Sequence, residues 1–418
     1  SFLLTRQVME PTSNLVHYLP LMFHSKDPSL FAGDEFIQAA IQRTPTWFWW
    51  VLGKFLPLQN PYPHLFVLNV LTRISNATLV YWIVRDLAKD WRAGLIAVVL
   101  FSGQIDTVLG RGDINWPYFT HTAASTPFLL LSLGLLVKEK WYPAFAVAGL
   151  VFNIHLLNTA YFSIFLILWL LIYRSGLGYR RLLGCLAVMA LAALPVLPKV
   201  FANLGDTATD TLWMNHMLDY HEKLLSPFRQ PLESWFRFGA CMMLMIHLIR
   251  KQNEPLDRSL GWAMVAMWFI LYLVGTAFTQ IIRVPFFLTF QPFRSTDIFM
   301  LFFFLWFSRE IVHGMTSDSL TTRLIHCGLL VLLFYFNLRT LPSQVKDILS
   351  MAWCVLCAMK ILTDIKLPAL ETGTGRRFIH SLSWSVVLFS FLLLGSFNYW
   401  SLQAGLSLWL LYNSHSWF

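Results

Sequence analysis

Long apolar runs separated by short polar turns are the dominant pattern of this sequence. A helix that crosses a membrane needs about 20 mostly apolar residues, and on that scale the chain predicts about 11–13 spans. The expected spans are residues 63–84, 92–110, 116–137, 141–157, 159–173, 182–202, 235–250, 259–280, 290–308, 320–338, 347–363 and 381–399. Residues 400–413 form a further short apolar stretch. The expected fold is therefore an all-α, polytopic transmembrane helix bundle.

The first 60 residues depart from this pattern. Residues 35–58 read EFIQAAIQRTPTWFWWVLGKFLPL, in which Trp47, Trp49 and Trp50 lie close to Pro45 and Lys54. Tryptophan favours the membrane–water interface because its ring is apolar and its N–H needs a partner. The segment is too short and interrupted to span, so it predicts interfacial helix; the alternative is a broken first span. The predicted organisation is a first loop at 1–60 and a transmembrane helical domain at 61–418.

Basic residues are concentrated in alternate turns between the expected spans. These turns hold Arg85, Lys89, Arg92, Lys138, Lys140, Arg174, Arg180, Arg181, Arg250, Lys251, Arg258, Arg309, Lys360, Lys366, Arg376 and Arg377. Lys and Arg accumulate in cytoplasmic loops of membrane proteins, so residues 1–60 are predicted to lie on the other side, in the periplasm or a lumen. The loops on that side are the longer ones, and we expect any functional site there.

Composition supports a membrane protein and argues against a soluble domain and against a nucleic-acid-binding protein. Only 13% of the 418 residues are charged and the mean hydropathy is +0.57, whereas soluble domains carry about 25% charged residues. The net charge of +9 would indicate nucleic acid in a soluble protein. Here the basic residues follow the turns, so they indicate membrane topology and no nucleic-acid partner is expected.

The five cysteines all lie in apolar runs. Cys354 and Cys357 have helical spacing within an expected span, and no second pair accompanies them. This arrangement favours buried thiols over a zinc or redox site. No cofactor and no metal-binding residues are predicted, although the sequence does not exclude a divalent metal.

Several polar side chains fall on the predicted outer face. They are Asp27, Asp34 and Glu35; Arg111, Asp113 and His121; His155 and Asn158; His216 and His221; and Arg283, Gln291, Arg294 and Asp297. Charged groups at membrane depth are costly and usually face a cavity or a partner. A carboxylate there can deprotonate an acceptor hydroxyl, and arginine can hold a phosphate through paired N–H donors. The set favours transfer from a lipid phosphate, with Arg294, Arg283, His155 and Arg111 as candidate phosphate-binding residues.

Each of these residues also has a structural interpretation. Asp34 follows Gly33 and precedes an amphipathic run, which is the pattern of a helix N-cap. His155 is compatible with a hydrogen-bonded structural histidine. Arg294 is three residues from Asp297, the spacing of a helical ion pair, and Arg111 can pair with Asp113 within its loop.

Three stretches resemble the GT-C superfamily of membrane glycosyltransferases that use polyprenyl-phosphate sugars, in an uncharacterised bacterial branch. They are YLPLMFHSKDPSLFAGDEF at 18–36, HTAASTPFLLLSLGLLVKEKWYPAFAVAGLVFNIHLLNTAYF at 121–162 and FQPFRSTDIFML at 290–301. The resemblance implies that an acidic residue in the first outer loop activates the acceptor. Asp34 matches that position best, with Glu35 second. It also implies location in a bacterial inner membrane.

This sequence departs from the family in two ways. Family members usually have a span before the first outer loop, whereas only residues 1–17 precede YLP here, which predicts a missing or lost helix. Many also carry a soluble outer domain, for which this chain has no sequence.

Three functions are open at this point. The first is a glycosyltransferase that moves a sugar from a lipid-phosphate donor, with membrane lipids and a polyprenyl-phosphate sugar as partners. The second is a non-catalytic scaffold subunit that binds other membrane subunits. The third is a transporter, which predicts an internal repeat and paired broken helices; no such repeat is present.

Overall fold

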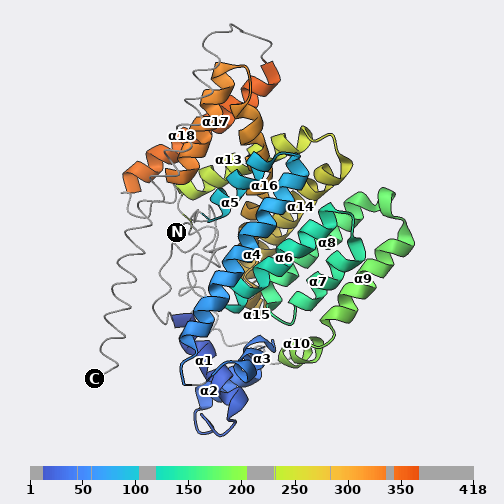
Figure 1. Ribbon diagram of the computed structural model, residues 1–418, viewed down its shortest axis with the longest axis vertical. Coiled ribbons are helices and arrows are strands. Elements are labelled where there is room, and N and C mark those ends of the chain that lie inside the picture. Colours follow the sequence, from blue (N-terminus) through green and yellow to red (C-terminus); the bar gives the residue numbers. More distant parts are fainter. Residues whose placement is uncertain are drawn as a thin grey trace.

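The computed structural model describes residues 13–44, 46–57, 59–102, 119–204, 230, 232–282, 284–335 and 343–366. This part of the chain contains helices and no strand, and it is long in one direction (Figure 1). Helices α1 (Ser13–Lys26), α2 (Glu35–Arg43) and α3 (Phe48–Phe55) lie together at one end. We call this the α1–α3 end.

The bundle follows in chain order. Its first half comprises α4 (Tyr62–Ala88), α5 (Trp91–Ser102), α6 (His121–Val137), α7 (Trp141–Val151), α8 (Leu156–Leu177), α9 (Tyr179–Ala193) and α10 (Leu197–Leu204). The second half comprises α13 (Leu232–Arg250), α14 (Pro255–Thr276) with a π-helical extension (Ala277–Ile281), α15 (Pro285–Phe290), a 3-10 turn (Pro292–Arg294), α16 (Ser295–Met315), α17 (Leu320–Tyr335) and α18 (Ser343–Lys366).

Four helices in the described part are long and apolar enough to cross a membrane. They cover Tyr62–Ala88, Leu156–Tyr173, Pro255–Ile281 and Pro292–Met315, and shorter apolar helices accompany them. The prediction of an all-α membrane helix bundle is confirmed, and the chain is an integral membrane protein. The helix bounds follow the expected spans because the length of an apolar run limits where a membrane helix can begin and end. The expected span at 381–399 lies outside the described residues.

Two expected segments are divided in the structure. Residues 182–202 form two helices, α9 and α10, separated by a turn at Leu194–Val196, because Pro195 lacks the N–H needed to continue α9. Residues 35–58 form α2 and α3, since Thr44 after α2 is extended, the conformation expected before the proline at 45. Helix α1 lies within residues 1–60, which were predicted to form a loop with an interfacial helix only at 35–58.

Helix α16 lies at the centre of the core. In the most apolar 18-residue window of its spanning segment 89% of the residues are buried, and Phe299, Phe302, Phe303 and Phe307 are fully enclosed. A helix that is apolar on all sides belongs in the interior of a bundle. One end of α16 follows Arg294 directly, so the position of that arginine depends on the packing of the whole helix.

Helices α1 and α3 have a small core of their own. Leu19, Met22 and Trp49 pack with Leu65 of α4 and with Phe119. The two helices cross so closely at Gly53 that a Cβ there would lie 2.4 Å from the carbonyl oxygen of Met22. Only glycine allows this approach, which holds α1 and α3 as one unit over the end of α4.

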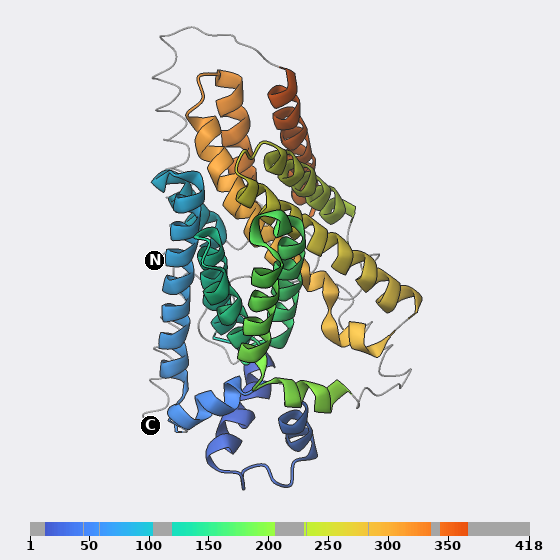
Figure 2. The same ribbon diagram turned by 90° about the vertical axis from the view of Figure 1, so that its right-hand side faces the viewer.

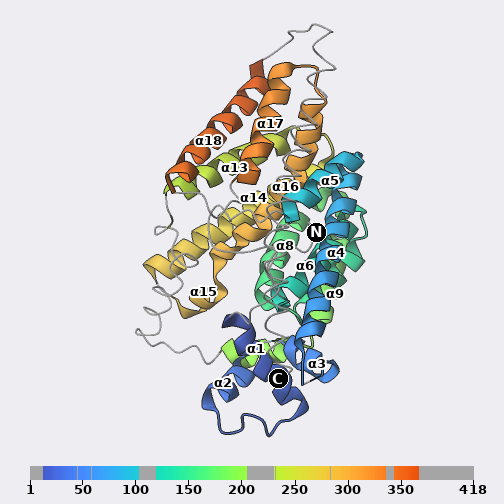
Figure 3. The same ribbon diagram turned by 60° about the vertical axis from the view of Figure 1, so that its left-hand side comes forward.

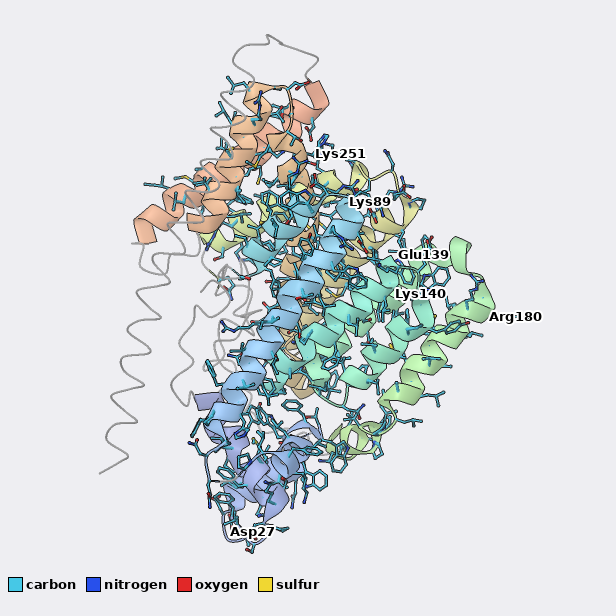
Figure 4. All side chains as sticks on the ribbon, in the orientation of Figure 1. Asp27, Lys89, Glu139, Lys140, Arg180 and Lys251 are labelled. Atoms are coloured by element: carbon cyan, nitrogen blue, oxygen red, sulfur yellow. The ribbon has the colours of Figure 1, made fainter. Side chains whose placement is uncertain are left out.

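The turns at the end away from α1–α3 are linked by charged and aromatic contacts. Lys138 pairs with Asp86 at 3.1 Å, Arg181 lies 5.5 Å from the centre of the Trp141 ring, and Arg309 pairs with Asp257 at 3.2 Å. Figure 4 shows Lys89 and Lys251 at this end and Asp27 at the α1–α3 end. The basic turns predicted to share a side of the membrane are therefore joined to one another by contacts.

A buried charge network fastens the last helices together. Its members are His247 and Lys251 at the end of α13, Glu310 of α16, His326 of α17, and Lys360 and Asp364 of α18. Lys360 is only 2% exposed and its Nζ lies 2.5 Å from Glu310 Oε1 and 2.7 Å from Asp364 Oδ1. Figures 1 and 3 both show α13, α17 and α18 gathered at this end. We call these six residues the Glu310 network.

Candidate functional site

A tight turn before α16 begins the most distinctive polar cluster at the α1–α3 side of the bundle. Gln291 joins α15 to the 3-10 turn with φ 48° and ψ 56°, the left-handed region. A non-glycine residue there costs about 1–3 kcal/mol and persists only where its surroundings impose it. The buried hydroxyl of Tyr161 on α8 imposes it by donating to the carbonyls of Phe290 and Gln291.

This turn sets the direction of Arg294. Its Nη1 donates to Gln291 Oε1 at 3.1 Å, while its Nε is buried and has no hydrogen-bond partner. His121, His155 and Tyr161 all lie within electrostatic range of the Arg294 guanidinium. No ion pair joins Arg294 to Asp297 within the described residues, so the expected helical pair is replaced by the contact with Gln291.

His155 lies buried in the turn between α7 and α8. Its Nδ1 accepts a hydrogen bond from the backbone N–H of Asn158 at 3.1 Å, so it caps α8, and the ring proton is assigned to Nε2. Burial, and then the charges of His121 and Arg294, lower the pKa of His155 well below its usual value. His155 is therefore a hydrogen-bonded structural histidine through Nδ1, as one of the two interpretations expected. Its Nε2–H remains as a donor.

His121 at the start of α6 completes the cluster. Its ring stacks on His155 with centroids 4.5 Å apart and an angle of 17°. Tyr18 of α1 and Trp49 of α3 lie edge-on to it, at 4.8 and 6.0 Å. The Nδ1 of His121 is buried without a hydrogen-bond partner. Helices α1 and α3 therefore form an aromatic cover over the imidazole pair.

Together these residues make a site suited to an anion. A buried polar atom left without a partner costs about 1–3 kcal/mol, and such an atom in a native fold requires an explanation. Here two occur in one cluster, the Nε of Arg294 and the Nδ1 of His121. An Arg Nε–H and Nη–H pair is the fork that matches two oxygens of a phosphate or carboxylate. We call His121, His155, Tyr161, Gln291 and Arg294 the Arg294 cluster.

The predicted catalytic carboxylates lie elsewhere. Asp34 and Glu35 are exposed at the start of α2, and Asp34 Oδ1 accepts from the backbone N–H of Ile37 at 3.0 Å, so it is the N-cap of α2. No hydrogen bond or ion pair of the described chain joins either carboxylate to Arg294. Asp27 bonds with Ser29, whose side-chain and backbone donors lower the pKa of that carboxyl.

Several predicted site residues cannot be placed. Arg111 and Arg283 lie outside the described residues, as do Asp113, His216 and His221. Of the predicted phosphate-binding residues, Arg294 and His155 lie close enough for the charge of one to affect the other. The structure adds His121, Tyr161 and Gln291, which were not predicted to bind phosphate. Within the described ranges, no group of three or more His, Cys, Asp or Glu side chains is placed to hold a metal ion.

The free thiols are in the apolar core. Cys241 and Cys357 are buried, and Cys354 is partly buried. Burial of this kind is the environment of inert structural cysteines.

Comparisons with protein-family models, with curated proteins and with solved structures find no match to this chain.

Proposed function

We propose that the chain is a GT-C-like membrane glycosyltransferase that moves a sugar from a lipid-phosphate donor. The observation that carries the proposal is the buried Arg294 cluster, with its partnerless Arg294 Nε and His121 Nδ1 at the α1–α3 end of the bundle. The phosphate of the donor would accept hydrogen bonds from Arg294 and from an imidazole. Its lipid chain would lie along the apolar helix faces.

In the proposed reaction the oxygen of an acceptor hydroxyl attacks the anomeric carbon of the sugar. The bond between that carbon and the phosphate oxygen breaks, and its electron pair leaves with the polyprenyl phosphate. The acceptor proton passes to a base. The predicted base is Asp34, with Glu35 second, and both are exposed at the start of α2 outside the Arg294 cluster, so the acceptor would reach them from the solvent side. The fixed charge of Arg294 favours the phosphate leaving group because its negative charge increases along the reaction.

The orientation that suits this chemistry places the α1–α3 end outside the cytoplasm. The basic turns at the opposite end support it, because Lys and Arg accumulate on the cytoplasmic side. In a bacterium this would be the outer face of the inner membrane.

The test uses the purified full chain in liposomes that contain a polyprenyl-phosphate hexose. A panel of glycans, peptides and glycerolipids supplies acceptor hydroxyls, and chromatography measures free polyprenyl phosphate, the product common to every acceptor. We expect release above that of empty liposomes with at least one pair. Absence of release with every pair would contradict the proposal and favour the scaffold function.

Asp34→Asn separates the two roles of Asp34. Asparagine caps a helix about as well as aspartate, so the melting temperature should not change. Loss of the base should lower polyprenyl phosphate release by about 10²–10⁴-fold. Glu35→Gln removes the adjacent exposed carboxylate, the second candidate base. If Asp34 is the base it should retain most activity, whereas a larger loss than in Asp34→Asn would assign the base to Glu35. Full activity of Asp34→Asn would leave Asp34 as a cap only.

A further inference from the structure

A second polar and aromatic surface lies at the α1–α3 end, separate from the Arg294 cluster. Trp47, just before α3, donates from Nε1 to the carbonyl oxygen of Pro195 at 3.1 Å, across 148 residues of sequence. The Nζ of Lys199 on α10 lies 3.7 Å from the centre of the Trp47 ring. These contacts clasp α3 to the α9–α10 turn, and Figure 2 shows the green α9–α10 segment reaching the blue helices of that end. We call this the α3–α10 surface.

Large apolar side chains are exposed on this surface. Phe55 is 80% exposed, Phe201 66% and Leu194 52%, and Trp50 and Val51 are exposed beside them. Large apolar side chains exposed on elements that contact one another mark contact with an apolar medium or a partner. Because α4, which is long and apolar enough to span, begins directly after α3, we expect the surface to lie at the edge of the bilayer. Tryptophans at this level are typical of the headgroup region.

Two ammonium groups lie among these rings. Lys54 Nζ is 4.9 Å from the centre of the Trp50 ring, and Lys199 Nζ lies over Trp47. Trp47 and Trp50 meet edge to face at 5.9 Å, which brings the two lysine–tryptophan pairs together. The segments that build the surface, 46–57 and 190–201, contain no Asp or Glu. Lysines beside aromatic rings at a membrane interface place their apolar stems along apolar surface and their ammonium groups among the headgroups.

We propose that the α3–α10 surface binds anionic phospholipids, with Lys54 and Lys199 contacting the headgroup phosphates. The exposed apolar side chains would contact the upper acyl chains, and Trp47 and Trp50 would lie between the two regions. Charge complementarity selects this occupant: the surface offers two cations and no acidic residue from its own segments. Neither lysine belongs to the Arg294 cluster, so the proposal stands or fails independently of sugar transfer.

Native mass spectrometry of the full chain, purified in detergent, tests it by titration with phosphatidylglycerol and, separately, phosphatidylcholine. Each lysine near an anionic headgroup contributes roughly fivefold to affinity. We expect the Lys54→Gln, Lys199→Gln double variant to bind phosphatidylglycerol about 30-fold more weakly. Lys54→Gln alone should weaken binding about fivefold, which keeps the test valid if the double variant folds poorly.

Lys140→Gln is the matched control, because Lys140 is an exposed lysine in the turn between α6 and α7, away from this surface (Figure 4). It should bind phosphatidylglycerol as the unaltered chain does. The proposal is overturned if phosphatidylcholine binds the unaltered chain as tightly as phosphatidylglycerol. It is also overturned if both the single and the double variant retain full affinity for phosphatidylglycerol.

Discussion

Replacing Arg294 by methionine should reduce polyprenyl phosphate release by at least about 100-fold. Hydrogen bonds to a charged group contribute about 1.5–3 kcal/mol each, and losing two of them removes about 3 kcal/mol or more. Since about 1.4 kcal/mol corresponds to a factor of ten, the expected loss is about a hundredfold or greater. Methionine fills a similar volume, so the loss would report the missing charge and donors.

Two comparisons distinguish phosphate binding from a structural effect. Gln291→Met removes the same protein hydrogen bond, from Arg294 Nη1 to Gln291 Oε1, but leaves the guanidinium in place; it should lose far less activity. Arg309→Met makes the identical substitution near the other end of α16, where Arg309 pairs with Asp257, and should leave turnover nearly unchanged. Equal losses in Arg294→Met and Arg309→Met would contradict a phosphate-binding role for Arg294.

An intermediate result is expected for Arg294→Lys. Lysine keeps the positive charge but lacks the planar fork that binds two oxygens at once. Its activity should therefore lie between those of Arg294→Met and the unaltered chain. The polyprenyl phosphate release assay reports this order directly, because each variant is measured with the same donor.

The helices of the bundle could be predicted because their signal is local. Each apolar run specifies its own helix, and the run that became α4 begins and ends within a few residues of its expected bounds. The Asp34 cap was predictable for the same reason: a short acceptor side chain directly before an amphipathic run satisfies a backbone N–H three residues ahead. Such features need no knowledge of the rest of the chain.

The missed features depend on local exceptions or on distant residues. Helix α1 contains Pro20 and several polar residues, which weakened its pattern, yet its packing against α3 stabilises it. The stacking of His121 on His155 joins the starts of two different helices, and no spacing rule connects them. The hydrogen bond between Trp47 and Pro195 likewise depends on tertiary packing. The sequence therefore predicted an interfacial segment but not its contact with the α9–α10 turn.

The Glu310 network illustrates the same limit and leads to the largest expected effect on stability. Its central pair joins α16 to α18, with Lys360 Nζ 2.5 Å from Glu310 Oε1. Lys360→Met should destabilise the fold by up to about 3–5 kcal/mol, because removing one partner of a buried pair leaves the other charge poorly compensated. Glu310 would keep only its longer contacts with Lys251 and His326, at 3.5 and 3.4 Å. Thermal unfolding in detergent, followed by circular dichroism, should show a melting temperature lower by several degrees.

Lys138→Met is the matched control. Lys138 pairs with Asp86 at 3.1 Å, but its side chain is 44% exposed, and exposed pairs contribute about 0–1 kcal/mol. Its melting temperature should stay close to that of the unaltered chain. Indistinguishable melting temperatures for Lys360→Met and Lys138→Met would show that the buried charge of Glu310 does not destabilise the fold when Lys360 is removed.

The double variant Glu310→Met, Lys360→Met decides what the pair contributes. Apolar replacement of both members of a buried ion pair is often neutral or stabilising, so the double variant should be more stable than Lys360→Met alone. The remaining contacts of Asp364 with His247 and Lys251 would persist, which limits the recovery. A double variant less stable than Lys360→Met would instead mean that methionine packs poorly between α16 and α18. In that case the loss in Lys360→Met would have to be assigned to packing, because an uncompensated Glu310 charge is absent from the double variant.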